Sequence, residues 1–338
     1  MSACRTMEEA IGGIHDNLES ASPRDLSAFW TVAQRMLNDD RRTTEGPPPL
    51  VPQLDSIFRK TMARVDAFAP RDLAQTALAL AKAAKSLGGV PRTRSDPEGG
   101  YREHLRGLLA GNGGGVDAFR SIADASALDL AGFDARCLSN LAYAYALAGR
   151  APVLDDGTAL FDRLAETSIP LLHRFKPQEL SNMVWAYTGI GASHPHLFAK
   201  VADRIDSLGH LEDFKPQELS NILLAYAKAE ISHLALFSKV ADHIVSLRHL
   251  GQFKPQELSN VVWAFRRAGV THAGLFDKVT DHISALTDLK TFNPQDLSNL
   301  SWTYVKAGAS HPPYFTSWRI TSSRSIASDR SSRRSFPT

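Results

Sequence analysis

The sequence predicts an all-α fold, namely an α-solenoid of stacked two-helix repeats with a 39-residue period. The first observation is an octapeptide, FKPQELSN, which begins at Phe175, Phe214 and Phe253 and returns as FNPQDLSN at Phe292. The second is that apolar residues within each unit recur at helical spacing, without the alternation of a strand. A two-helix hairpin cannot bury its own apolar face, whereas stacked copies can. A fixed period of such hairpins therefore predicts a solenoid.

The first helix of each unit is expected to begin at the proline of the octapeptide. Pro177 suits a first helical turn, because its missing N–H would have no partner there. Leu180, Val184 and Tyr187 lie at i, i+4 and i+7 and form one apolar face. Gly189 and Gly191 are expected to end the helix. The equivalent leucines are expected in the core: Leu180, Leu219, Leu258 and Leu297.

The second helix of the unit follows a short turn. Ser193 is a suitable cap, and Pro195 stands just inside the helix. Its apolar face is formed by Leu197, Phe198, Val201, Ala202, Ile205 and Leu208. The unit is therefore helix, turn, helix.

The chain divides into three regions. Degenerate helical repeats are expected over 1–129, with first helices from Ser22 and Phe68 and a Gly- and charge-rich flexible insertion near 88–115. Regular two-helix repeats occupy 130–318, and the first of them starts at Gly132. Together with the two degenerate units, the chain is expected to contain seven first helices. The Ser/Arg-rich tail, 319–338, is expected to be disordered.

The last unit has no recognisable second helix, because the tail replaces its apolar pattern. A solenoid needs a polar terminal cap. We therefore expect either that another segment covers this end or that the chain is a truncated version of a longer protein.

Composition is ordinary for a globular protein, with 43% hydrophobic and 22% charged residues among 338. The net charge is +2, but the tail alone carries five arginines against one aspartate, or +4. Subtracting the tail leaves the body at about −2 (+2 minus +4). Bulk charge therefore gives no general support for nucleic-acid binding.

Several classes of function are disfavoured by what the sequence lacks. Cys4 and Cys137 stand far apart, which argues against a disulfide scaffold or a cysteine zinc site. No run of 18 apolar residues would span a membrane. The GNGGG stretch lacks the GK[ST] of a phosphate loop, and no hydrolase, zincin or kinase motif occurs. We expect neither an enzyme nor a cofactor.

A histidine follows Ser or Thr in each regular unit, at His194, His233, His272 and His311. A shared metal would require ligands about 2 Å from one ion. Helices of neighbouring units lie about 8–10 Å apart. These histidines are therefore interpreted as residues at helix N-termini rather than as metal ligands.

A polar stripe runs along each first helix beside its leucine face. In the unit that begins at Phe175, the stripe consists of Gln178, Asn182 and Trp185 at i, i+4 and i+7. The asparagine recurs as Asn140, Asn221, Asn260 and Asn299, and the tryptophan as Trp263 and Trp302.

Asparagine is a mediocre helix residue, so its repetition requires a reason. One interpretation is a hydrogen-bonded asparagine ladder with tryptophan filling the seam between repeats. The other is a groove lining, in which amides meet base edges or peptide backbone and tryptophan stacks on bases.

Basic residues vary from unit to unit near the end of the first helix. They are Lys228, Arg266, Arg267 and Lys306. They form either an ordinary solvated surface or a local rail of phosphate contacts.

The repeat resembles the octotricopeptide type, in which units of about 38–40 residues carry a P-Q/E-x-L-[SA]-N-x-x-W-A-[YF]-A-K-x-G first helix. FKPQELSNVVWAFRRAG, from Phe253, matches this pattern closely. The resemblance covers about 130–322 well and about 20–130 loosely. Similar arrays occur in organellar RNA-binding proteins that often end in a RAP domain, and in FAST-kinase-like relatives. The resemblance implies binding of single-stranded RNA in organellar RNA processing, stability or translation.

Two hypotheses follow for the function. The first is a monomeric single-stranded RNA-binding repeat protein, for which the resemblance implies a mitochondrion or chloroplast. The N-terminus carries Glu8, Glu9, Asp16 and Glu19, which is not typical of a transit peptide, so the cytoplasm stays open. The second is an armadillo-like protein-interaction scaffold that grips an extended peptide.

Overall fold

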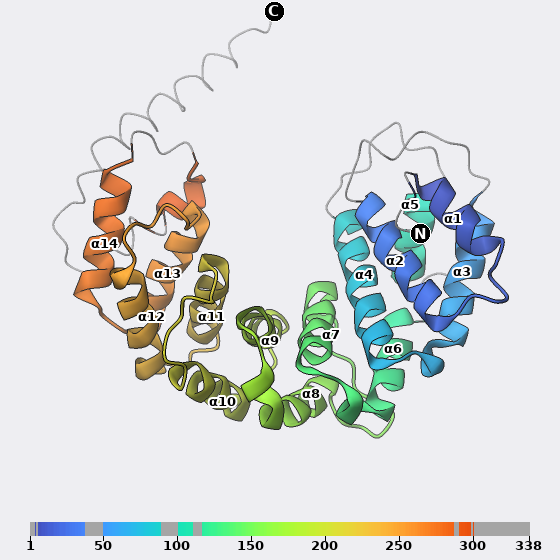
Figure 1. Cartoon of the computed structure of the whole chain (residues 1–338), viewed down its shortest axis with the longest axis horizontal. Helices are drawn as coiled ribbons and strands as arrows, with labels where there is room; N and C mark the ends of the chain where they lie inside the picture. Colours follow the sequence, from blue (N-terminus) through green and yellow to red (C-terminus); the bar gives the residue numbers. More distant parts are fainter. Residues whose placement is uncertain are drawn as a thin grey trace, which may run out of the picture. The chain divides into compact units, whose positions relative to one another are not determined.

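The computed structural model describes residues 4, 6–37, 50–88, 101–110, 117–286, 291–298 and 300. These residues form α-helices, short 3₁₀ turns and one isolated bridge between Val153 and Ala159, with no β-strand among them (Figure 1). The all-α prediction is confirmed. The chain divides into two compact units, Met1–Val201 and Ala202–Thr338, which are described separately.

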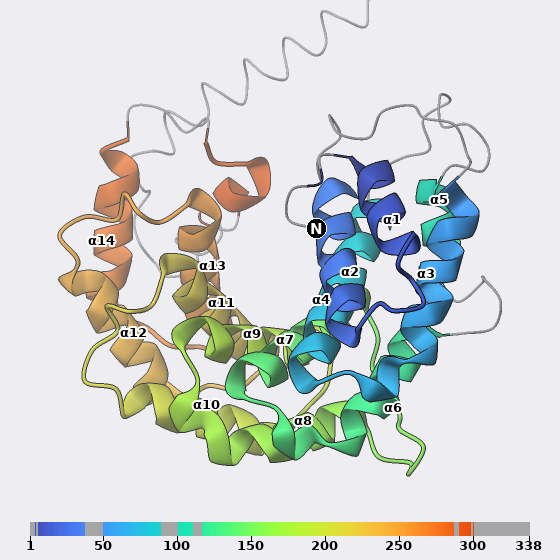
Figure 2. The ribbon, with the colours of Figure 1, turned by 45° about the vertical axis from the view of Figure 1, so that its right-hand side comes forward.

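Unit 1 contains two helical layers. Its helices are α1 (Met7–His15), α2 (Pro23–Leu37), α3 (Val51–Ala63), α4 (Pro70–Gly88), α5 (Tyr101–Leu109), α6 (Ala118–Leu128), α7 (Ala135–Ala148), α8 (Leu160–Ser168), α9 (Pro177–Gly189) and the first part of α10 (Pro195–Asp206). Helices α2, α4, α7 and α9 pack in that order and form the first-helix layer (Figures 1 and 2). Helices α3, α6 and α8 pack in order behind them as the second-helix layer. Stacking of neighbours is the solenoid arrangement.

Unit 2 repeats this pattern with the regular sequence. It contains α11 (Pro216–Lys228), α12 (Leu234–Ser246), α13 (Pro255–Arg267) and α14 (Ala273–Ser284). The first helices α11 and α13 pack together, and so do the second helices α12 and α14. The unit that begins at Phe292 starts a helix at 294–298.

The segment near 88–115, expected to be a flexible insertion, contains helix α5 over Tyr101–Leu109. Leu105, Leu108 and Leu109 are buried, and α5 packs against α3 and α4. Leucines at i, i+3 and i+4 form an apolar stripe that the glycine content of the flanking sequence obscured. The remainder of the insertion, 89–100 and 111–116, lies outside the described residues, as does the tail at 319–338.

The octapeptide starts a helix through its glutamate as well as its proline. The Glu179 carboxylate accepts a hydrogen bond from the Lys176 backbone N–H at 2.9 Å, and the side chain is only 9% exposed. The same contact recurs at Glu218 with Lys215 (2.9 Å) and at Glu257 with Lys254 (2.8 Å). A carboxylate at this third helical position satisfies a backbone donor that the helix leaves unpaired.

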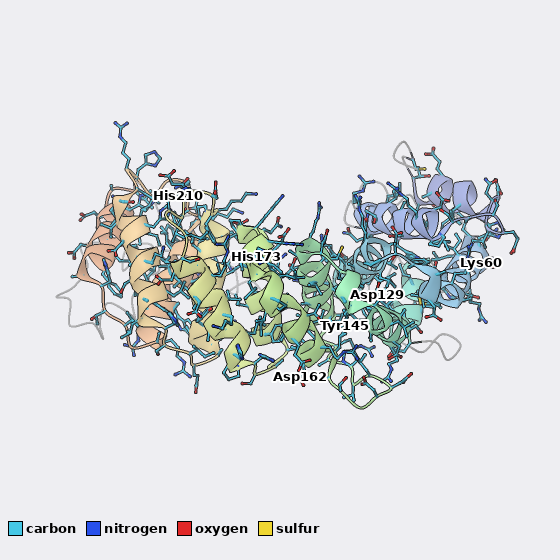
Figure 3. All side chains as sticks on the ribbon, turned by 60° about the horizontal axis from the view of Figure 1, so that its bottom comes forward. Lys60, Asp129, Tyr145, Asp162, His173 and His210 are labelled. Atoms are coloured by element: carbon cyan, nitrogen blue, oxygen red, sulfur yellow. The ribbon has the colours of Figure 1, made fainter. Side chains whose placement is uncertain are left out.

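The core joins the two layers through buried aromatic residues. Leu180, Leu219 and Leu258 are each 1% exposed, as expected, whereas Leu297 is half-buried. Tyr145 on α7, labelled in Figure 3, donates its hydroxyl to the Phe119 carbonyl oxygen on α6 at 2.6 Å. Tyr187 on α9 donates likewise to Phe161 on α8 at 2.5 Å. Each tyrosine therefore holds a first helix to the second helix that precedes it.

The first helices end in a left-handed residue. Gly149, Gly191 and Gly269 adopt φ angles of 65°, 69° and 69°, and Glu230 takes φ 58° at the equivalent place after α11. Glycine adopts this conformation without steric cost, whereas a residue with a Cβ is strained by about 1–2 kcal/mol.

Replacing Glu230 tests this strain. We expect Glu230→Gly to be more stable than Glu230→Ala by about 1 kcal/mol, because both lose the carboxylate and only glycine relieves the backbone. Urea unfolding of the two variants measures the difference. Equal stability of the pair would contradict a strained Glu230.

Candidate nucleic-acid interface

The polar stripe predicted from the sequence lies at the protein surface. On α9, Gln178 is exposed, while Asn182 and Trp185 are half-buried. The equivalent residues have the same exposure class: Gln217 and Asn221 on α11, and Gln256, Asn260 and Trp263 on α13. Asn140 on α7 is half-buried too. We call this set the amide stripe.

The asparagines of the amide stripe do not form a ladder. Within the described part of the chain, no hydrogen bond involves the side chains of Asn140, Asn182, Asn221 or Asn260. The hydrogen-bonded ladder considered above is therefore not what the structure contains. Each amide keeps a donor and an acceptor available for a ligand.

Trp185 fills a seam between repeats, as the structural interpretation proposed. Its ring lies against Tyr143 on α7, with centroids 5.0 Å apart and planes tilted by 45°. Because Trp185 is half-buried rather than enclosed, part of its ring surface remains accessible. Leu224 takes the tryptophan position on α11 and is also half-buried.

The predicted rail of basic residues is only partly available for phosphates. Lys228 is exposed at the end of α11, and Arg266 is half-buried. Arg267 forms an ion pair with Glu230, which offsets its charge. Asn299, Trp302 and Lys306 lie outside the described residues.

Sequence reasoning missed two basic residues on α4 and α7 that occupy the position of Gln178. Arg71 and Arg136 precede Gln75 and Asn140 by four residues, as Gln178 precedes Asn182. They therefore replace the exposed glutamine of the regular repeats by arginine. An alignment of these units on their first-helix leucines would have shown that the two arginines occupy the glutamine position.

The recurring histidines cap the second helices. Nδ1 of His194, His233 and His272 accepts a backbone N–H three residues later, at 3.1, 3.2 and 3.1 Å. This confirms that these three histidines stand at helix N-termini, whereas His311 lies outside the described residues. In the described ranges, no cluster of His, Cys, Asp and Glu has the makings of a metal site. None of the helices described combines the length and apolar character needed to cross a membrane.

Comparison with known proteins points to RNA. A family model described as RNA-editing substrate-binding complex 6 protein matches residues 155–293, which is less than half of the chain. The match covers α8 to α14 and therefore includes the regular repeats. No curated protein matches the chain. The family match supports an RNA-related role, in general terms, for this all-α protein.

Proposed function

We propose that the chain binds single-stranded RNA along its amide stripe and acts in mitochondrial RNA processing such as editing. The observation behind the proposal is the set of half-buried asparagines without hydrogen-bond partners in the described repeats. Asn140, Asn182 and Asn260 stand three residues before a tyrosine or tryptophan, whereas Asn221 stands before Leu224. Amides read base edges, and aromatic faces stack on bases that a single strand leaves accessible. The role is binding rather than catalysis.

The family match supports the RNA part of this proposal and is compatible with a mitochondrial location. It lends no support to the chloroplast or the cytoplasm. A RAP domain and the octotricopeptide assignment rest on the sequence resemblance alone.

A protein-interaction scaffold is the second candidate, favoured by the near-neutral regular repeats. The three units from Phe175 to Thr291 carry formal charges of −2, +1 and +1. Tight RNA binding normally draws on an excess of phosphate-contacting cations. An extended peptide would use the same free amides for its backbone.

Alanine substitution of the stripe tests the proposal. We expect Asn182→Ala/Asn221→Ala/Asn260→Ala to weaken binding of a pool of labelled single-stranded RNAs at least about tenfold, since a net hydrogen bond contributes about 1 kcal/mol. Fluorescence anisotropy measures the affinity, and circular dichroism checks that the variant keeps its helices.

A matched control is available on the second helices. His196→Ala/Ser238→Ala removes exposed polar side chains from α10 and α12, away from the stripe, and should leave the affinity unchanged. Binding by the asparagine variant at wild-type affinity would exclude the amide stripe as the RNA surface.

A further inference from the structure

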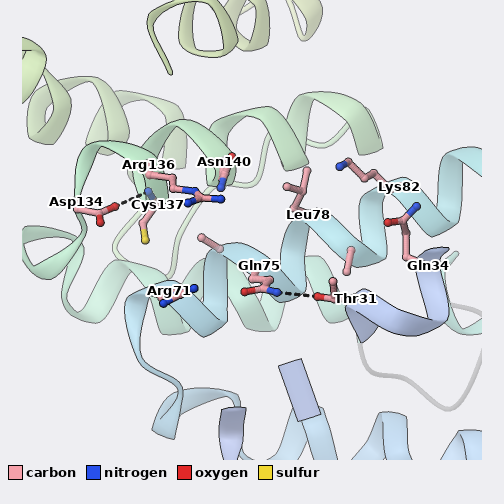
Figure 4. A pocket seen from close by; sticks show the side chains of 12 residues that line it. Thr31, Gln34, Arg71, Gln75, Leu78, Lys82, Asp134, Arg136, Cys137 and Asn140 are labelled. Carbon is pink, nitrogen blue, oxygen red and sulfur yellow. Dashed lines mark hydrogen bonds between the residues drawn. The ribbon is translucent and has the colours of Figure 1, made fainter. Parts of the chain in front are cut away.

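A hollow of about 400 Å³ lies in unit 1 between α2, α4 and α7 (Figure 4). Its wall is the surface of the first-helix layer where the degenerate repeats that contain α2 and α4 meet the first regular repeat, which contains α7. Asn140 of the amide stripe belongs to this wall. The residues that line the hollow therefore include helix positions that glutamine and asparagine occupy in the regular repeats.

The hollow is positively charged. Arg71 and Lys82 on α4 and Arg136 on α7 line it, against a single carboxylate, Asp134. No ion pair joins any of the three cations to a described residue. The Asp134 carboxylate is occupied by the Cys137 backbone N–H at 2.7 Å, which holds the pKa of Asp134 below its usual value. Three cations against one acid leave the hollow with a formal charge of +2.

Cys137 adds no negative charge to the wall. Burial of the thiol raises the pKa of Cys137 to about 12, so the sulfur stays protonated and uncharged near neutral pH. The surplus positive charge is therefore available to an anionic ligand.

The polar wall also contains amides in need of partners. Gln34 is only 8% exposed, and its side chain makes no hydrogen bond within the described ranges. Gln75 donates from Nε2 to the Thr31 hydroxyl at 2.9 Å, which leaves its carbonyl oxygen open. The Gln34 amide and the Gln75 carbonyl oxygen can therefore hydrogen-bond a polar ligand that enters the hollow.

The cations stand at the two ends of the hollow. Arg71 and Lys82 are separated by 11 residues of α4, or about 16 Å at the helical rise. Figure 4 shows Arg71 and Arg136 toward one end and Lys82 beside Gln34 toward the other, with Gln75 and Leu78 between them. This spread suits an extended polyanion better than a compact ion.

We propose that this hollow holds a short segment of the bound single strand, with its phosphates at the two cationic ends. The inference rests on the proposed RNA-binding function. Guanidinium groups grip phosphate through paired hydrogen bonds, and Lys82 acts as a point charge. Asn140, beside Arg136, and Gln34, beside Lys82, each meet the edge of a base, and Leu78 supplies an apolar contact between them. The hollow is thus the electrostatic anchor that the near-neutral repeats from Phe175 to Thr291 lack.

Salt dependence of RNA binding by the full chain tests this anchor. For single strands, each phosphate contact contributes about 0.7 to the slope of log affinity against log salt. We expect Arg71→Gln/Lys82→Gln/Arg136→Gln to lower the magnitude of the slope by about 2 and the affinity at about 50 mM salt by more than tenfold. Gln34→Leu should weaken binding without changing the slope.

Two lysines on α4, one inside the hollow and one outside it, distinguish a phosphate contact in the hollow from a general effect of surface charge. Lys82→Gln should reduce the slope by about 0.7, while Lys85→Gln, an exposed lysine three residues further along that does not line the hollow, should leave it unchanged. If the two substitutions change the slope equally, Lys82 contributes only as general surface charge, and the proposal that the hollow anchors RNA is wrong.

The outcomes separate the two proposals. Wild-type chain that binds RNA while the triple variant binds equally well overturns the anchor and leaves the amide stripe as the RNA surface. Wild-type chain that binds no RNA overturns both. Loss of binding by the triple variant, with wild-type behaviour of Lys85→Gln and an unchanged circular dichroism spectrum, supports the anchor.

Discussion

Replacing Phe237 by alanine is expected to lower the free energy of unfolding by about 3–5 kcal/mol, as large-to-small changes of buried phenylalanine do. Phe237 on α12 is fully buried, and its ring packs edge-on against Phe265 of α13 with centroids 5.0 Å apart. It fills the space between a second helix and the first helix of the next repeat. The substitution leaves a cavity at the junction through which neighbouring repeats stabilise each other.

Urea unfolding followed by circular dichroism measures the loss. Phe237→Leu is the control, because it keeps most of the apolar volume and should cost less than about 1.5 kcal/mol. If both variants lose the same small amount, Phe237 does not hold α12 against α13 and the repeat junction has been misassigned.

Replacing Lys278 by methionine is expected to cost about 1.5–3 kcal/mol, the range for hydrogen bonds to charged groups. Its Nζ, on α14, donates to the Val245 carbonyl oxygen at 3.0 Å and to the Leu247 carbonyl oxygen at the end of α12. These carbonyls are among the last of a helix, which leaves them without intrahelical donors and at its negative end.

Lys239 makes the equivalent contacts with Asp206 and Leu208 at the end of α10, so the role belongs to the repeat. Lys254→Met is the matched control, since the Lys254 side chain is exposed at the start of α13. Equal stability of the Lys278 and Lys254 variants, measured by urea midpoint and slope, would refute a capping role for the repeated lysine.

Much of the fold was predictable because its determinants are local and repeated. The proline of the octapeptide correctly predicted where α9, α11 and α13 begin. Leu180 and its equivalents correctly predicted which face of these helices is buried. The capping carboxylate of Glu179 was less visible, because an acid near a helix start is favourable even without a defined hydrogen bond. Helix α5 escaped notice because its short leucine pattern lies among glycines.

The candidate site was only half predictable. The stripe of Gln178, Asn182 and Trp185 follows from helical periodicity, but its exposure does not, since the same spacing fits a buried seam. The contact of Trp185 with Tyr143 and the pairing of Arg267 with Glu230 depend on which repeats face each other. The cationic hollow depends on three helices far apart in sequence, two of them from degenerate repeats.

RNA bound by this protein is expected to lie on the first helices. Photocrosslinking of the full chain to single-stranded RNA containing 4-thiouridine, followed by mass spectrometry of the crosslinked peptides, locates the bound strand. We expect adducts on α9, α11 and α13 beside the asparagines, and on α4 or α7 at the hollow. Adducts confined to the second helices α10, α12 and α14, or none under conditions where the RNA binds, would contradict it.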